Sequence, residues 1–411
     1  MRAAALVVLG LGAALAAQAP APLSGLVAEA LRANPQLRAA RLGVEASAAV
    51  AAQRRALPDT QLAVQQLAVG TPVPFAGYAN SDFAYIGLGA SQEIPFPGKR
   101  ALRAEVATHA TEVDRRELDA TQRAIVAQLE TDYYELASLQ ANLATLVQQQ
   151  ATLRQLEQVA GDRYRVGEGR QQDVLQAQVQ QTRILAEISD RHRLMADSEA
   201  RLKQELGRPQ TSVDVVAEPL AEHALTVSLA ALLAAVSEGN PGVRADQARI
   251  EAAGAGVALA RKEFKPDFNA SYMWQHTASQ FRDYYMATFS LNLPNRGRHK
   301  AELAQATSEL DQAQALRQQT LQAQQAEVAR QYAAAQNAAE QLRILNQGLL
   351  PQAQAEYRSA VNAYQIGAVD FQALLAAFLD QLDLEMDRQD QLQAQAAARA
   401  ALTALTGVPL S

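Results

Sequence analysis

The hexapeptide Asn34-Pro35-Gln36-Leu37-Arg38-Ala39 recurs in the second half of the chain as Asn240-Pro241-Gly242-Val243-Arg244-Ala245. Four further pairs of segments that contain proline or glycine follow in the same order in both halves. They are Pro58-Asp59 and Pro266-Asp267, Pro95-Phe96-Pro97-Gly98 and Pro294-Asn295-Arg296-Gly297, Tyr164-Arg165-Val166-Gly167 and Tyr364-Gln365-Ile366-Gly367, and Leu206-Gly207-Arg208-Pro209 and Thr406-Gly407-Val408-Pro409. Helices rich in alanine resemble one another by composition alone, but shared proline and glycine positions are hard to obtain by chance. The pattern therefore predicts a duplicated chain with structural repeats at 18–209 and 210–411.

Each repeat is expected to open with a helix, roughly 24–57 and 228–264, which ends before the Pro-Asp pair. The period of the hydrophobic pattern then changes from helical to two. Strands are predicted at about 60–69, 83–94, 267–276 and 284–293. The clearest one places Phe268, Ala270, Tyr272 and Trp274 on one side and polar residues on the other.

Strands of this length with one apolar face suit the wall of a membrane-spanning barrel, although a small soluble hairpin packed on a helix has a similar pattern. Four strands cannot close a barrel, and an open strand edge in lipid is very costly. Three chains would supply twelve strands. Strand count alone also allows a dimer with eight.

The remaining sequence predicts one long helical hairpin per repeat, at 98–206 and 297–406. No stop signal interrupts 98–164 or 297–364 apart from Pro351, which should kink or divide the second helix. Leucines at coiled-coil spacing between Leu136 and Leu153 require a neighbouring helix. The chain then reverses at the two Tyr-x-Val/Ile-Gly segments, where glycine permits a tight turn.

Composition and motifs exclude several classes of protein. The net charge is -6 and only 5% of residues are aromatic, which argues against binding to nucleic acid and suits long helices. The chain contains no cysteine, so a disulfide, a thiolate metal site and a lipidated cysteine are excluded. No linked catalytic motif is present, so we expect neither an enzyme nor a bound cofactor. Residues 1–17 are typical of a secretory signal peptide, with Arg2 before a short apolar run.

The order of these features resembles the TolC-like outer-membrane efflux protein family over essentially the whole chain after the signal peptide. The residues that carry the resemblance are the duplicated Asn-Pro helices, the Tyr-x-Val/Ile-Gly turns and two strand-to-helix junctions. The junctions are Gln92-Glu93-Ile94-Pro95-Phe96-Pro97-Gly98-Lys99-Arg100 and Leu293-Pro294-Asn295-Arg296-Gly297-Arg298.

The resemblance implies a homotrimer whose twelve-stranded β-barrel sits in outer-membrane lipid and continues into a twelve-helix tunnel in the periplasm. It implies two further partners, a periplasmic adaptor protein and a proton-driven pump of the inner membrane. The residues expected at the tip that docks the adaptor are Tyr164, Val166, Gly167, Tyr364, Ile366 and Gly367. The resemblance also places a candidate gate at Arg170, Asp173 and Asp370, although Val369 and Ala373 stand where family members often carry charged gate residues.

The junction from Pro95 to Lys99 looks most like the branch of the family that serves heavy-metal exporters of the resistance-nodulation-division type. The sequence itself indicates no metal site, because its five histidines and the methionines Met195, Met273, Met286 and Met386 do not cluster. The expected function is a passive exit duct for solutes such as metal ions or drugs. Two alternatives stay open: a soluble periplasmic coiled-coil adaptor or scaffold, and the outer-membrane duct of a protein secretion system.

Overall fold

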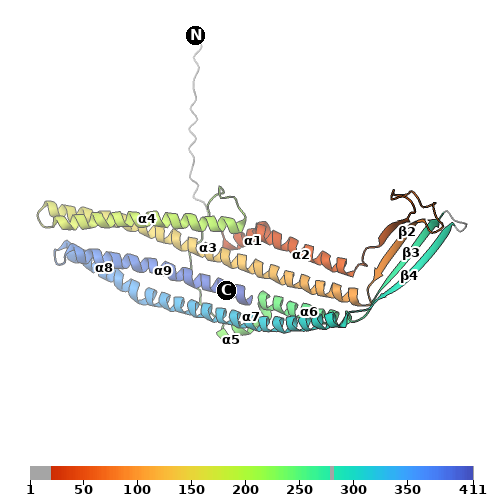
Figure 1. Cartoon of the computed structure of the whole chain (residues 1–411). Helices are drawn as coiled ribbons and strands as arrows, with labels where there is room; N and C mark the ends of the chain where they lie inside the picture. The colour runs from red at the N-terminus through yellow and green to blue at the C-terminus, as the bar shows by residue number, and fades with distance from the viewer. Residues whose placement is uncertain (1–19, 278–281, 411) are drawn as a thin grey trace, which may run out of the picture.

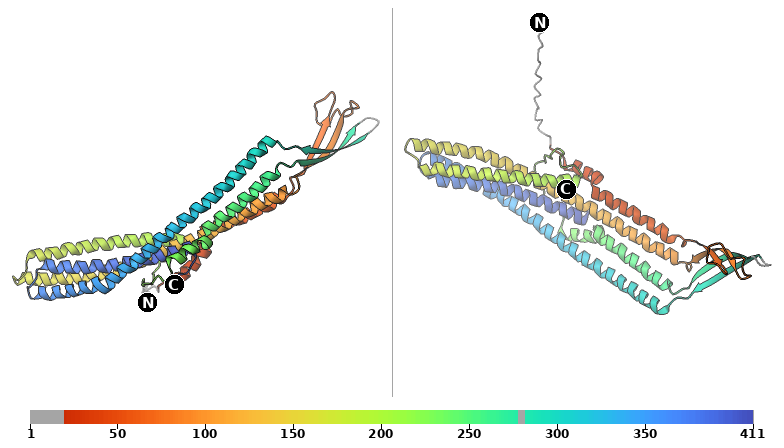
Figure 2. Two further views of the ribbon diagram at one scale, coloured as in Figure 1. Left: turned by 90° about the horizontal axis from the view of Figure 1, so that it is seen from below. Right: turned by 45° about the horizontal axis from the view of Figure 1, so that its top comes forward.

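The computed structural model describes residues 20–277 and 282–410. The predicted signal peptide at 1–17 lies outside the described residues. The molecule is a long, bent rod with a sheet at one end and the turns of two helical hairpins at the other (Figure 1). The views in Figure 2 show that the helices run side by side along most of this length.

Both repeats contain the same succession of two short helices, two strands and a long helical hairpin. The first repeat consists of α1 (Leu23–Ala33), α2 (Pro35–Arg55), β1 (Gln61–Leu67), β2 (Tyr85–Ile94), α3 (Lys99–Arg165) and α4 (Gln171–Leu206). The second consists of α5 (Leu229–Gly239), α6 (Pro241–Lys262), β3 (Asp267–Thr277), β4 (Asp283–Asn292), α7 (Arg296–Ile344), the π-helix η1 (Leu345–Leu349), α8 (Leu350–Gln365) and α9 (Phe371–Thr406). The predicted fold class, a duplicated and mainly helical chain with a small strand part, is confirmed.

The expectation of one continuous helix before each strand pair is wrong. Asn34 separates α1 from α2, and Asn240 separates α5 from α6. Proline at the next position disfavours helical geometry for the asparagine and is itself suited to the first turn of a helix. Each asparagine side chain then accepts hydrogen bonds from the two following free backbone N–H groups, so a new helix starts there.

The long helices account for the length of the rod. α3 has 67 residues and spans about 100 Å at the usual rise per residue. The corresponding helix of the second repeat is interrupted by η1, which ends two residues before Pro351. Since proline lacks an N–H and crowds the preceding turn, the wider π-helical turn accommodates it without ending the helix.

The two strand pairs form one antiparallel sheet in the order β1-β2-β3-β4. The pairing of β2 with β3 joins the repeats, with Leu88 opposite Trp274 and Ile94 opposite Phe268. Within the part of the chain that the structure describes, the outer edges of β1 and β4 have no neighbouring strand.

The helical part is held together by separate apolar clusters along its length. One lies near the hairpin turns, where Leu153 of α3, Ile184 of α4 and Phe371 of α9 are fully buried. Two more lie near the middle of the rod, one in each repeat, around Leu136 and Val236. None of the helices in residues 20–277 and 282–410 is long and apolar enough to cross a membrane.

Candidate functional site

The turn between α3 and α4 presents apolar side chains at the end of the rod. Gly167 adopts a left-handed conformation with φ 82°, and its N–H donates to the Tyr164 carbonyl oxygen at 3.1 Å. This geometry suits glycine, because a side chain would be strained there. The turn leaves Val166 71% exposed and Tyr164 47% exposed.

The turn between α8 and α9 repeats this backbone but differs in what it buries. Gly367 has φ 76° and Ile366 is 82% exposed, so the tip of this turn matches the first one. Tyr364, in contrast, is only 4% exposed and packs edge-on against Phe371, with ring centroids 5.6 Å apart. Of the two repeated tyrosines, one is therefore available to a partner and the other belongs to the core.

Arg163 ties the two hairpins together just behind the turns. Its guanidinium donates through Nη1 to the Tyr364 carbonyl oxygen, and its Cζ lies 4.9 Å from the centroid of the Tyr364 ring. Burial raises the pKa of the Tyr364 hydroxyl, and the nearby Asp173 carboxylate adds to that rise. Arg163 is not among the residues predicted for the tip. The one signal for it in the sequence is that the second repeat has Ala363 at the matching position.

The candidate gate residues serve as helix caps within the chain. The Asp173 carboxylate accepts the backbone N–H of Arg170 at 3.5 Å, and the Asp370 carboxylate accepts the N–H of Ala373 at 2.9 Å. Among the described residues, no ion pair joins Arg170, Asp173 or Asp370 to any other side chain. Both carboxylates sit at helix N-termini, where negative charge is favourable.

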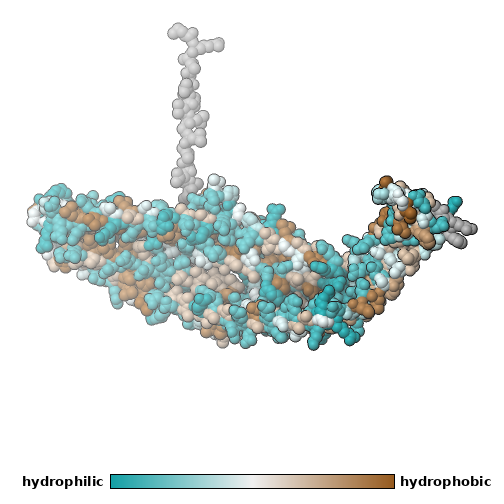
Figure 3. Space-filling model, viewed as in Figure 1, coloured by the Kyte–Doolittle hydropathy of each residue, from teal (hydrophilic) through white to brown (hydrophobic). Residues whose placement is uncertain are grey.

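The strand register sorts the sheet into an apolar face and a polar face. Successive side chains of a strand point to opposite faces, and residues paired across two strands lie on the same face. One face of the sheet therefore collects most of the large apolar residues. This apolar face contains Leu62, Val64, Leu88, Ile94, Phe268, Tyr272, Trp274, Tyr285, Phe289 and Leu291. Figure 3 shows apolar residues along the sheet end of the molecule.

The apolar face is exposed in the single chain and ordered by aromatic stacking. The rings of Phe268 and Phe289 stack with centroids 5.6 Å apart, and those of Tyr272 and Tyr285 with centroids 6.3 Å apart. Leu62 and Phe289 are more than half exposed. Exposed apolar patches of this kind mark contact with a membrane or another protein.

The opposite face of the sheet is mostly polar. It carries Gln61, Gln65, Ser91, Glu93, Asn269, Ser271, Gln275, Thr288, Ser290 and Asn292, together with the glycines of β2, Ala63, Leu67, Tyr85, Tyr284 and two methionines. Such a division between the faces is the pattern of a strand wall that has lipid on one side and water on the other.

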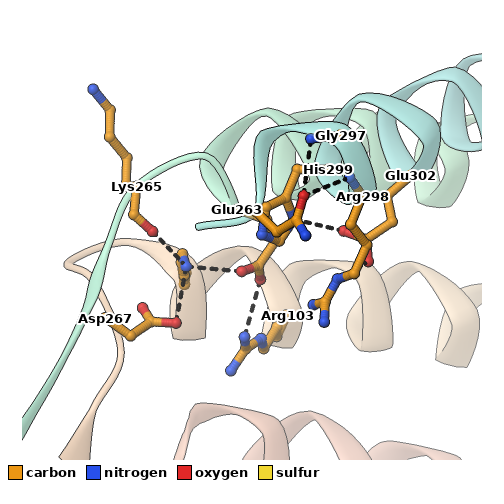
Figure 4. A network of polar contacts seen from close by, with 10 residues as sticks. Arg103, Glu263, Lys265, Asp267, Gly297, Arg298, His299 and Glu302 are labelled. Atoms are coloured by element: carbon orange, nitrogen blue, oxygen red, sulfur yellow. Dashed lines mark hydrogen bonds and ion pairs between the residues drawn. The ribbon is translucent and has the colours of Figure 1, made fainter. Parts of the chain in front are cut away.

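A buried lysine fastens the sheet to the helices. Lys99, the first residue of α3, is 1% exposed, and its Nζ lies 2.8 Å from Glu263 Oε2 and 3.0 Å from Asp267 Oδ2 (Figure 4). The same ammonium donates to the Lys265 carbonyl oxygen at 2.9 Å, and Glu263 also accepts from Arg103. The first strand-to-helix junction is thereby locked to the segment that joins α6 to β3.

Within the described ranges, no group of three or more His, Cys, Asp and Glu side chains is arranged to hold a metal ion. The methionines, however, are not all scattered as the sequence suggests, because the register places Met273 opposite Met286.

Comparison with known proteins identifies both the architecture and the family. A family model described as outer membrane efflux protein matches residues 26–208 and 232–408. No curated protein matches the chain in sequence.

Several solved structures share the fold. A membrane protein from Pseudomonas aeruginosa is similar with a TM-score of 0.81 and 19% identity, over 94% of this chain and 92% of that chain. The outer membrane protein VceC from Vibrio cholerae gives a TM-score of 0.78 and 21% identity, over 95% and 97% of the two chains. The outer-membrane channel OprN gives a TM-score of 0.79 and 20% identity, over 94% of this chain and 90% of that chain.

Proposed function

Because the chain belongs to the outer membrane efflux protein family, it is an outer-membrane efflux channel and not an enzyme, and we propose that three copies of it form one conduit. The alternative of a soluble periplasmic adaptor is wrong.

The open edges of the sheet are the observation that supports closure of the barrel by further copies of the chain. β1 and β4 each leave one row of backbone N–H and C=O groups without a neighbouring strand among the described residues, while the apolar face beside them suits lipid. Unpaired backbone groups in lipid cost several kcal/mol each, so these edges must be paired by another chain. Because the strands alternate in direction, β4 of one copy would meet β1 of the next antiparallel, as in outer-membrane barrels.

The helical part would continue the conduit away from the membrane. The hairpins of α3 with α4 and of α8 with α9 point away from the sheet, and their turns expose Val166 and Ile366. We assign adaptor docking to these turns, with Tyr164, Gly167 and Gly367 shaping them and Tyr364 supporting them from the core. A proton-driven inner-membrane pump would deliver the cargo.

We assign a gate to Arg170, Asp173 and Asp370, at the start of α4 and α9. Their capping roles within one chain leave the Arg170 side chain and one oxygen of each carboxylate for a neighbouring copy. The cargo would be a small solute, and the junction from Pro95 to Lys99 supports a pump of the heavy-metal type. Duplicated domains at 18–209 and 210–411, preceded by a signal peptide at 1–17, complete the proposal.

Cysteine crosslinking tests the assembly, since the native chain contains no cysteine. Leu62→Cys on β1 would be combined in turn with Ala287→Cys, Phe289→Cys or Leu291→Cys on β4, so that the register between copies need not be known. A short bifunctional maleimide should convert one of these variants into covalent trimers on a denaturing gel. A Cys pair at Leu88 and Trp274, which face each other inside one chain, is the control and should stay monomeric.

Covalent dimers without trimers would favour an eight-stranded barrel, and monomers throughout would contradict the assembly. In the same cells, Val166→Cys or Ile366→Cys should crosslink to a periplasmic partner, whereas Arg183→Cys on the exposed side of α4 should not.

A further inference from the structure

Two methionines face each other across β3 and β4 on the polar face of the sheet. Met273 is the register partner of Met286, and side chains in such cross-strand pairs have Cβ atoms about 4.5–5.5 Å apart. Their neighbours on this face are Ser271 and Gln275 on β3 and Thr288 and Tyr284 on β4, and three of these four side chains are polar. Met286 is 48% exposed.

The other two methionines of the described chain have a different environment. Met195 and Met386 pack against apolar clusters in the helical part, where methionine commonly fills gaps. Met273 and Met286 belong to none of the apolar clusters found among the described residues. Core packing therefore does not account for them.

The Met273 and Gln275 side chains lie close against two glycines of β2. Gly89 is the β2 partner of Met273, and Gly87 is the partner of Gln275. A Cβ added at Gly89 would lie 3.3 Å from the Met273 Cε, and one at Gly87 would lie 3.2 Å from the Gln275 Cγ. Glycine at these two positions therefore lets the Met273 methyl group and the Gln275 side chain pack on the β2 backbone, which holds Met273 in place on this face.

The Met273 sulfur lies on this face and accepts one hydrogen bond. The Gln275 amide Nε2 donates to Met273 Sδ at 3.1 Å, so a soft cation would bind through the second sulfur lone pair or displace the amide. Thioether sulfur is a soft, neutral ligand that selects Cu(I) over hard cations. The chain has no cysteine to compete, and His276 lies on the opposite face.

We propose that Met273 and Met286 form a binding site for a soft monovalent cation, Cu(I) or Ag(I), on the inner wall of the conduit. This inference rests on the proposed function, because the polar face becomes the lumen only when the barrel closes. Threefold symmetry places three such pairs at one level of the lumen. Neutral thioethers bind the cation without the charge of a thiolate, which suits transit, since conduction needs a site that the ion can leave.

Titration with Ag(I) as its nitrate in chloride-free buffer tests the site on the detergent-solubilised protein. Calorimetry should give one Ag(I) per chain, and X-ray absorption at the silver edge should show sulfur neighbours. Loss of an outer-shell partner costs about 10- to 100-fold in metal affinity, so Met273→Leu and Met286→Leu, which each remove a ligand, should cost at least that much. Gly89→Ala should also weaken binding by crowding the Met273 side chain.

Met195→Leu and Met386→Leu are the matched controls. Each removes one thioether from an apolar cluster of the helical part, so the Ag(I) titration should stay unchanged. Leu and Met are close in volume, and trimer formation on a gel checks that each variant assembles. Equal Ag(I) binding by the wild type and the Met273→Leu/Met286→Leu double variant would overturn the site, as would a spectrum without sulfur neighbours.

The two proposals fail in different ways. A wild-type protein that forms trimers and conducts ions but binds no Ag(I) overturns the metal site alone. A wild-type protein that forms neither trimers nor conductance overturns the proposed function itself.

Discussion

At the scale of the residue, Glu199 near the end of α4 shows how burial makes a single carboxyl group sensitive to pH. Burial, reinforced by the neighbouring Asp214 carboxylate, raises the pKa of Glu199 to about 7. Lys203 donates to Asp214 Oδ1 at 2.6 Å and lowers the pKa of Asp214 instead. One proton is thus retained at Glu199 under mildly acidic conditions, while Asp214 stays ionised.

This arrangement predicts a pH-dependent stability. A carboxyl group whose pKa is raised by folding stabilises the folded state fully below its unfolded pKa of 4.5, and this contribution is lost as the pH rises through about 7. Glu199→Gln should therefore remove part of the loss in unfolding free energy between about pH 5 and about pH 8. Urea midpoints at both pH values measure it. Glu187→Gln, an exposed change on the same helix, should leave the change in unfolding free energy with pH as it is in the wild type. The same pH dependence in Glu199→Gln as in the wild type would contradict the prediction.

At the scale of the element, the repeated asparagines connect a short helix to the far end of a long hairpin. Asn34 Oδ1 accepts from the N–H groups of Gln36 and Leu37, while its Nδ2 donates to the Glu205 carbonyl oxygen at 2.8 Å. Asn240 does the same in the second repeat, where its Nδ2 donates to the Leu405 carbonyl oxygen at 2.9 Å. Each asparagine side chain therefore caps the start of one helix and donates a hydrogen bond to the end of another.

Asn34→Ala and Asn240→Ala should each destabilise the protein. Loss of the cap costs about 0.5–2 kcal/mol, and the carbonyl oxygen left without its donor adds about 1–3 kcal/mol. Chemical denaturation of the detergent-solubilised protein measures the sum. Asn34→Ser keeps a side-chain oxygen that can cap the helix and loses the hydrogen bond to Glu205 without adding a charge, so it should fall between the wild type and Asn34→Ala. Asn337→Ala, on the exposed side of α7, should have almost no effect.

The strands and the long hairpins could be predicted because their signals are local. Apolar and polar residues alternate in 268–274, and glycine marks each turn. The separation of α1 from α2 at Asn34 was not predicted, since the spacing of apolar residues continues through it. Only the following proline indicates that a new helix begins. Contacts between distant residues were beyond such reasoning. Lys99 reaches Glu263, and Arg163 reaches Tyr364, through tertiary packing that no local pattern encodes. The pairing of Met273 with Met286 depended on strand register.

At the scale of the whole molecule, the two repeats are joined at both ends of the rod. At the sheet end, β2 pairs with β3, and Lys99 binds the carboxylates of Glu263 and Asp267. At the other end, the Arg163 guanidinium clasps Tyr364 over a shared apolar cluster. The sheet end is a continuous set of hydrogen bonds, whereas near the hairpin turns non-directional apolar packing is supplemented by the polar contacts of Arg163. Movement of one hairpin relative to the other should therefore be easiest at the turns.

Arg163→Ala removes this clasp and should raise the passive conductance of the channel in a planar bilayer, because the second hairpin can then separate from the first. Arg163→Lys should restore little, since an ammonium cannot both stack on the ring and reach the carbonyl oxygen as a planar guanidinium does. Arg183→Ala, an exposed change on α4, is the control. Asp173→Ala tests the gate that we propose between copies. If Asp173→Ala raises conductance and Arg163→Ala does not, the channel opens between subunits while the two hairpins of each chain move as one body.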